Sequence, residues 1–271
     1  FLGIRIGCAR CHNHPLERHT QDDFYHFAAY FSRVKFDRKE AKMGVTLLNV
    51  SHPDQNQNKN PVGVSQPRTG MFMKAQPLDR TPNDVKPTDD PRTVLAKWIT
   101  DPSNEYFTGA MVNRVWRHYF DVGLVEPVDD LRATNPPTNP ELLDYLTVSF
   151  MDQQWSIKSL IRQIVTSETW QQSSDRRIDA EAVDPENRLF ARMNRTRLDF
   201  EGQRDAVLAV AGRLDQAIGG KSVDVTNLSL TTDTGTGRRT IYARIDRQNF
   251  PGLFRTFDVA SPDAHAAKRF Q

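Results

Sequence analysis

Hydrophobic residues recur every three or four positions over much of this chain, which is the spacing of one face of an α-helix. The spacing predicts a helix over residues 21–34. Thr20 is its expected N-cap, and two aspartates follow in the first turn, where negative charge suits the helix dipole. The apolar stripe of this helix consists of Phe24, Phe27, Ala28 and Phe31.

The same period predicts further helices after residue 90. Asp90 followed by Pro91 is typical of a helix start, and Ser156 is the expected N-cap of a later helix. One helix begins at Pro91, and the others span about 104–120, 140–153, 156–170 and 199–214. Four tryptophans recur at helical core spacing, so we expect them to pack inside the protein: Trp98, Trp116, Trp155 and Trp170.

Residues 35–90 interrupt this pattern, because they are rich in Pro, Asn, Gln, Asp and Lys and show little periodicity. Short β-prone pieces at 45–50 and 71–73 are expected to pair as strands. Near the C-terminus, only 240–245 alternates as a strand does. The predicted fold is mainly α, a multi-helix domain with a small β element near the C-terminus and a long irregular segment between two parts. We place the domain boundary near residue 88, which gives domains 1–88 and 89–271.

The composition bears on which classes of binding partner the protein can have. The 271 residues carry 36 basic and 34 acidic side chains, and a net charge of +2 gives no electrostatic argument for nucleic acid binding. No apolar run approaches the 18 or more consecutive residues that would indicate a membrane-spanning helix. The chain begins at Phe1 inside an apolar segment and without an initiator Met, so we interpret it as a fragment or a processed form.

The chain has two cysteines, and both lie in a C-x-x-C-H motif formed by Cys8, Cys11 and His12. This motif is the sequence signature of covalent c-type haem attachment. The thiols form thioether bonds to the haem vinyl groups, and the histidine supplies the proximal ligand to iron. Covalent haem attachment takes place outside the cytoplasm, so this interpretation predicts an exported protein.

Two alternatives to haem remain open. Cys8, Cys11, His12 and His14 could bind zinc, whose preferred ligands are thiolate and imidazole, although four ligands within seven residues is tighter than the usual spacing. The cysteines could instead pair as a disulfide in a non-catalytic scaffold or carbohydrate-interaction module. The predicted cofactor is therefore haem c, with zinc as the alternative.

The sixth ligand of a haem iron is not evident from the sequence. His14 is only two residues from His12, which favours a contact with an iron ligand or a haem propionate over ligation from the opposite face. Residues with a suitable ligand atom are His14, Met43, His26, Met71 and Met73. A methionine suits electron transfer because it raises the potential, whereas an open position suits catalysis or small-ligand binding.

Two further polar clusters have simpler interpretations. Asp129, Asp130 and Asn135 carry oxygen atoms suited to Ca²⁺, but they lack EF-hand spacing, so capping or turn roles are favoured. Arg114 and His118 share a helix face and could hold an anionic group, although a salt-bridge role is favoured.

Several longer strings carry a family resemblance. They include C-x-x-C-H-x-H-P, V-N-R-V-W and N-P-E-L-L-D, and they lie at 2–15, 20–25, 112–120, 123–132, 139–144 and 164–170. Together they resemble the planctomycete cytochrome-c-like secreted proteins, which carry two adjacent domains of unknown function. The resemblance implies a periplasmic or secreted protein, often with an upstream cytochrome domain in the same chain, from bacteria that degrade complex polysaccharides.

The function that we predict combines the motif with the resemblance. It is electron transfer by an exported c-type haem protein, or a part in a redox enzyme that acts on extracellular substrates, with polysaccharide as a candidate. The expected partners are other redox proteins or the upstream cytochrome domain. If the chain is catalytic, it is an oxidoreductase, and its catalytic residues are unknown.

Overall fold

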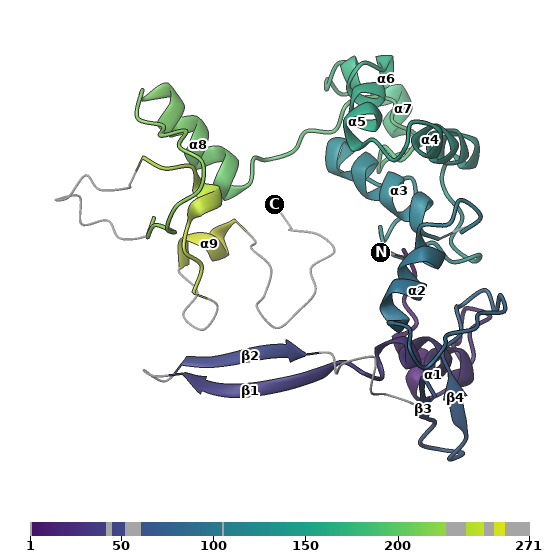
Figure 1. Ribbon diagram of the computed structural model, residues 1–271. Helices are drawn as coiled ribbons and strands as arrows, with labels where there is room; N and C mark the ends of the chain where they lie inside the picture. Colours follow the sequence, from purple (N-terminus) through teal and green to yellow (C-terminus); the bar gives the residue numbers. More distant parts are fainter. Residues whose placement is uncertain are drawn as a thin grey trace. The chain divides into compact units, whose positions relative to one another are not determined.

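The computed structural model describes residues 2–41, 45–51, 61–104, 106–225, 237–246 and 252–257, with the backbone alone along 36–51. The chain divides into two compact units, Phe1–Met193 and Asn194–Gln271, each described here by itself. Helices are the main regular elements of both, so the predicted fold class is confirmed (Figure 1). Residue 88 lies inside the first unit, and the sequence-based division at that point stays a prediction about domains.

The first unit begins with the 3-10 helix η1 (Gly7–Arg10), followed by α1 (Gln21–Ala28) and a second 3-10 turn, η2 (Ala29–Phe31). Thr20 is the N-cap of α1, as predicted. Its hydroxyl accepts a hydrogen bond from the Asp23 backbone N–H at 3.2 Å, and its own backbone N–H donates to the Asp23 carboxylate at 2.7 Å. This capping box satisfies two backbone donors at the helix start. The helix predicted over 21–34 is shorter than expected, because it tightens into η2.

Two antiparallel hairpins follow. β1 (Lys35–Ala41) pairs with β2 (Val45–Ser51), and β3 (Gly63–Ser65) pairs with β4 (Phe72–Lys74). The β-prone pieces at 45–50 and 71–73 are therefore strands, although each pairs with its own neighbour in sequence. A small core joins η2, the second hairpin and the next helix, and consists of Ala29, Tyr30, Val62, Ala75 and Leu95.

The helical part of the first unit contains α2 (Pro91–Ile99), α3 (Phe107–Phe120), α4 (Pro140–Asp152), α5 (Ile157–Val165), α6 (Glu168–Gln171) and α7 (Ile178–Glu181). Asp90 and Ser156 cap α2 and α5, as predicted. The prediction of a single helix over 156–170 is wrong. It breaks after Val165, because the Ser167 hydroxyl donates back to the Ile164 carbonyl at 2.7 Å and caps the separate helix α6.

The main core lies where α3, α4 and α5 pack together. Its buried members are Val112, Trp116, Phe120, Leu124, Val125, Leu143, Leu146, Phe150, Leu160 and Ile164. The Trp116 and Phe120 rings stack at 4.1 Å, and Trp155 and Trp170 pack against the same core. The fourth tryptophan, Trp98, packs against the smaller core. The tryptophans are thus packing residues, as predicted.

The second unit contains α8 (Phe200–Val210), the 3-10 helix η4 (Thr240–Tyr242) and α9 (Gly252–Thr256). The strand predicted over 240–245 is wrong. The Asp205 carboxylate accepts hydrogen bonds from the Thr240 backbone N–H at 2.7 Å and from its hydroxyl at 2.6 Å, which holds this backbone in a tight turn. The β element near the C-terminus is limited to isolated bridges, one of which joins Val223 to Ala243.

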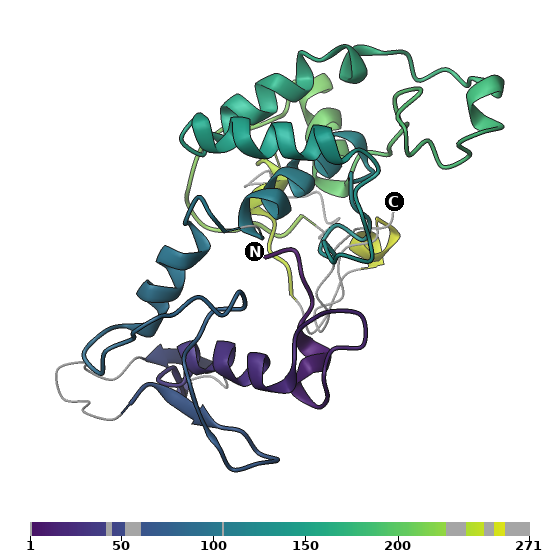
Figure 2. The same cartoon turned by 90° about the vertical axis from the view of Figure 1, so that its right-hand side faces the viewer.

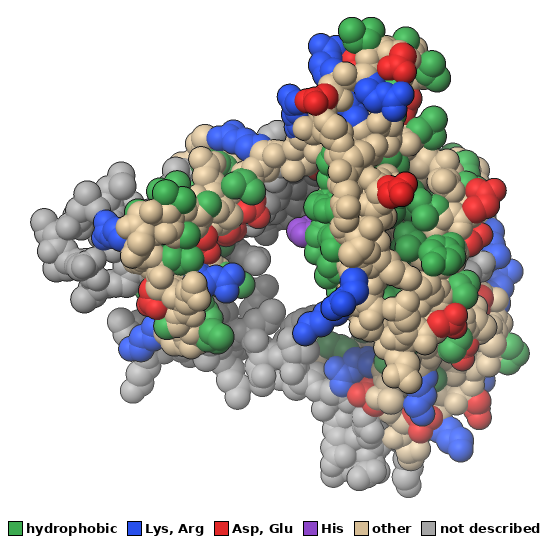
Figure 3. Space-filling view, turned by 90° about the horizontal axis from the view of Figure 1, so that it is seen from above, with side chains coloured by type: hydrophobic (Ala, Val, Ile, Leu, Met, Phe, Trp, Pro, Cys, Tyr) green, Lys and Arg blue, Asp and Glu red, His purple; other side chains and the backbone are tan. Residues whose placement is uncertain are grey.

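Surface character gives little direct indication of a partner. Hydrophobic, basic and acidic side chains are intermingled on the face that Figure 3 shows. Across the described ranges, the helices are too short or too polar to cross a lipid bilayer.

Candidate functional site

The C-x-x-C-H motif folds as one tight turn. Cys8 lies in η1 and Cys11 is its C-cap, whose backbone N–H donates to the Cys8 carbonyl at 3.3 Å. Ala9 is fully buried and anchors the turn, whereas both cysteines are exposed free thiols. The two thiols are therefore accessible from solvent and not joined by a disulfide.

His12 is exposed, and its hydrogen bond determines its tautomer. Its Nδ1 lies 2.7 Å from the Asn13 backbone carbonyl. Because a carbonyl oxygen only accepts, Nδ1 carries the proton, and in the neutral ring Nε2 keeps its lone pair. Histidines that bind metals commonly donate their second ring N–H to such a carbonyl, which orients the ring. The His12 ring is thus prepared for ligation through Nε2.

His14 has the opposite arrangement. Its Nδ1 accepts a hydrogen bond from the Leu16 backbone N–H at 3.2 Å, so in the neutral ring the proton is on Nε2. That nitrogen is a donor, which suits a carboxylate and not a metal ion. Among the described residues, no three His, Cys, Asp or Glu side chains gather to hold a metal ion. The structure therefore does not assemble Cys8, Cys11, His12 and His14 into a zinc site.

The other candidate ligands are placed differently. His26 lies in α1 and its Nδ1 is 2.6 Å from the Lys74 carbonyl, so its Nε2 is also the free nitrogen of a neutral ring. Met71 is 60% exposed and Met73 is buried in β4. Met43 lies outside the described residues. Among the candidates that the structure describes, no side chain is found in contact with His12 as an evident sixth ligand.

Helix α1 supports the motif from one side. The Arg10 carbonyl accepts hydrogen bonds from the Gln21 side chain at 2.9 Å and from the Tyr25 hydroxyl at 3.3 Å. The Gln21 backbone N–H also donates to the Asn13 side chain at 3.1 Å. The start of α1 thus fixes the residues on both sides of the thiols.

The segment before the motif is tied to the helical part of the unit, and Figure 2 shows it running from there down to η1 and α1. The Leu131 backbone N–H donates to the Gly3 carbonyl at 2.7 Å, and Arg5 forms a 2.6 Å ion pair with Asp129. Gly3 has φ of 65°, and a Cβ there would lie 2.6 Å from Leu131, so glycine is required. These contacts join the C-x-x-C-H segment to the loop that follows α3.

The Asp129 loop is thereby structural, as favoured from the sequence. Burial on its own raises the pKa of Asp129, but the hydrogen bond and charge of Arg5 outweigh it and hold the pKa below its usual value. Asp130 pairs with Arg132 at 3.3 Å, and the Asn135 side chain donates to two backbone carbonyls. These groups have partners within the protein in place of a Ca²⁺ ion.

Arg114 and His118, the two α3 residues considered for anion binding, lie in different surroundings. Arg114 is half-buried and its charge contributes to the lowered pKa of Asp129. His118 is exposed and its ring meets Tyr119 edge to face at 5.1 Å. The favoured electrostatic role therefore fits Arg114, whereas no anionic partner of His118 is found in the described part of the chain.

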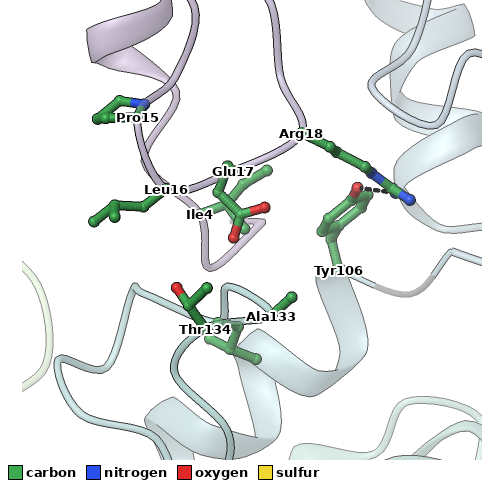
Figure 4. A pocket seen from close by; sticks show the side chains of 9 residues that line it. Ile4, Pro15, Leu16, Glu17, Arg18, Tyr106, Ala133 and Thr134 are labelled. Atoms are coloured by element: carbon green, nitrogen blue, oxygen red, sulfur yellow. Dashed lines mark hydrogen bonds between the residues drawn. The ribbon is translucent and has the colours of Figure 1, made fainter.

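A groove opens beside the motif, and no pattern in the sequence predicts it. It has a volume of about 630 Å³ and lies between the segment after the motif and the loop after α3 (Figure 4). At one edge, the Arg18 guanidinium donates to the Tyr106 hydroxyl at 2.8 Å. The residues that line it are Ile4, Pro15, Leu16, Glu17, Arg18, Tyr106, Leu131, Ala133 and Thr134. Their positions are far apart in sequence, so only the tertiary fold brings them together.

His19 lies next to this groove and is 3% exposed. Burial lowers its pKa, which outweighs the opposing influence of the Glu17 and Asp23 charges. The ring is therefore neutral at pH 7, and it packs against Tyr106 with a centroid distance of 6.5 Å. It contributes packing and not positive charge to the groove.

Together, the fold and the site define a mainly helical protein. Its first unit carries a turn with two exposed thiols and an exposed imidazole, and this turn is joined to the helices of the same unit. The chain belongs to a family described as protein of unknown function, DUF1553, which matches residues 91–271. Residues 1–36, which contain the motif, match a second family of unknown function, DUF1549. The two adjacent families expected from the resemblance are thus found. Neither a curated protein nor a solved structure matches the chain.

Proposed function

We propose that this chain is part of an exported c-type haem protein that transfers electrons, of the planctomycete cytochrome-c-like type. The observation that carries the proposal is the state of His12. Its Nδ1–H is bonded to the Asn13 carbonyl at 2.7 Å, which leaves Nε2 for a metal, in the same turn as two free exposed thiols. These are the three groups that covalent haem attachment requires.

Each residue has a defined task in this proposal. Cys8 and Cys11 would hold the haem through thioether bonds, and His12 would ligate its iron. When bound, the haem supplies one-electron chemistry, which the axial ligands and burial tune. The Asn13 carbonyl orients the His12 ring and increases its basicity. The His14 Nε2–H is a donor for an anionic group such as a haem propionate.

The location follows from the attachment chemistry, whereas the partners and the substrate class follow from the family resemblance. Because haem is attached covalently outside the cytoplasm, we place the protein in the periplasm or outside the cell. Its electron partners are other redox proteins or an upstream cytochrome domain of the same chain. If the chain forms part of an enzyme, that enzyme is an oxidoreductase acting on extracellular substrates, with polysaccharide as the candidate class.

The test is export of the full chain to the periplasm of a host with a haem-maturation system. We expect a mass increase of one covalently attached haem and a sharp α-band in the reduced-minus-oxidised absorption spectrum. The C8S/C11S double variant should lose the adduct. H14A should keep both the adduct and the spectrum, whereas H12A should change the spectrum because the axial ligand is lost.

Two results would overturn the proposal. One is wild-type protein without an adduct and with stoichiometric zinc by elemental analysis. The other is protein without an adduct or metal in which mass spectrometry after thiol labelling finds Cys8 and Cys11 joined as a disulfide.

A further inference from the structure

The groove beside the motif has apolar walls and one carboxylate at its centre. The apolar residues that line it are Ile4, Pro15 and Leu16, together with Leu131 and Ala133 of the loop after α3. Figure 4 shows the Glu17 carboxylate pointing into the space between these residues, while Arg18 turns toward Tyr106. A volume of about 630 Å³ is within the range of small-molecule sites.

The Glu17 carboxylate lacks a donor from the protein. Its Oε1 is shielded from solvent without a hydrogen-bond partner, so an occupant can reach the carboxylate only through Oε2, and no ion pair or hydrogen bond to Glu17 is found within the described ranges. A half-buried carboxylate in this state has lost water and gained no compensating donor. The neighbouring His19 is neutral at pH 7 and so supplies no cation. Arg18 also lines the groove, but its guanidinium donates to the Tyr106 hydroxyl at 2.8 Å and not to Glu17. The groove therefore favours an occupant that brings a positive, hydrogen-bonding head group to this carboxylate.

The walls determine the rest of the occupant. Leu16 is 50% exposed, which is a large apolar surface left open to solvent beside Glu17. An aliphatic body covering Leu16 gains free energy in proportion to the area buried. An anionic head group is disfavoured by the Glu17 charge, and a single carboxylate is too few ligands for a bare metal ion. A protonated amine on an aliphatic stem satisfies both the carboxylate and the walls.

We infer that this groove binds an aliphatic amine, with its ammonium group on the Glu17 carboxylate and its stem against Leu16 and Leu131. The amine is either a free small molecule or the lysine side chain of an extended peptide, since both present the same chemistry. This site is independent of the haem proposal, because it uses neither the thiols nor His12.

Isothermal titration calorimetry of the full chain tests the site with three probes that share one stem: protonated hexylamine, 1-hexanol and hexanoate. We expect saturable one-to-one binding of hexylamine, much weaker binding of hexanol and none of hexanoate. E17Q should weaken hexylamine binding at least about tenfold, the loss expected for one charge-assisted hydrogen bond. L16A should weaken hexylamine and hexanol binding alike.

E186Q is the matched control, because Glu186 is exposed and outside the groove and the substitution changes the net charge equally. It should bind hexylamine as the wild type does. Titration with N-acetyl-lysine methylamide separates the two sources, since tighter binding than hexylamine indicates a peptide lysine and weaker binding a free amine. The inference is overturned if hexanol binds as tightly as hexylamine, if E17Q and E186Q behave alike, or if none of these probes shows saturable binding.

Discussion

The ion pair between Asp23 and Arg80 gives the sharpest stability prediction. The Asp23 carboxylate accepts two hydrogen bonds from the Arg80 guanidinium, at 2.9 and 2.8 Å, and also completes the capping box of α1. Burial raises the pKa of Asp23, but the bonds from Arg80 and Thr20 outweigh it and lower the pKa from 3.8 to about 2. The ionised carboxylate therefore stabilises the folded first unit.

The substitution Asp23→Asn removes the charge and keeps the shape. A pKa lowered from 3.8 to about 2 corresponds to about 2.5 kcal/mol. Arg80 is 60% exposed, so solvent screens part of this energy, and we expect a loss of about 1–2 kcal/mol at pH 7. Because the folded-state pKa is lowered, this stabilisation is present above pH 4 and is lost as the pH falls toward 2.

Urea unfolding monitored by tryptophan fluorescence is the suitable assay. The chain has 4 tryptophans, and Trp98, Trp116, Trp155 and Trp170 all lie in Phe1–Met193, so the signal reports the first unit alone. Asp84→Asn is the control, because Asp84 is exposed and the chemical change is the same. The reasoning is refuted if D23N destabilises no more than D84N at pH 7, or if the difference between D23N and wild type does not shrink between pH 4 and pH 2.

Two further predictions concern buried polar side chains. Asn113 is fully buried, and its side chain bonds the backbone N–H and C=O of Val125 at 3.0 and 2.9 Å. Asn113→Ala should therefore destabilise the first unit by about 3 kcal/mol or more. A loss under about 1 kcal/mol in the same urea assay would contradict this prediction. Burial raises the pKa of Tyr30 to about 12, so its neutral form stabilises the fold below pH 10 and this contribution is lost as the pH rises toward 12. Absorbance titration at alkaline pH should show one late phenolate that Tyr30→Phe removes, and an unchanged titration curve would count against a buried hydroxyl.

Local signals in the sequence were sufficient for most helix starts. Thr20, Asp90 and Ser156 all cap helices as predicted, because capping depends on a side chain and the backbone two or three residues away. Helix ends were predicted less well. The break at Ser167 depends on a hydroxyl bonding back to Ile164, which hydrophobic spacing does not reveal.

Features that depend on distant residues could not be predicted. The alternation over 240–245 suggested a strand, but the Asp205 carboxylate, in a different helix, holds Thr240 in a turn. The contrast between His12 and His14 follows from backbone groups that approach each ring only after folding. The groove beside the motif likewise combines residues 4, 15–18, 106, 131, 133 and 134, which no single stretch of sequence places together.

The contacts between the N-terminal segment and the loop after α3 cross the boundaries that the family matches give. A domain defined by sequence family is therefore not the same as a folded unit in this protein. The family boundaries fall at residues 36 and 91, yet the Gly3 carbonyl and Arg5 depend on Leu131 and Asp129 across those boundaries. A module exchanged between relatives would carry only half of each pair. In this chain, therefore, the segments matched by the two families are not independent, because the residues at positions 3, 5, 129 and 131 stabilise both of them.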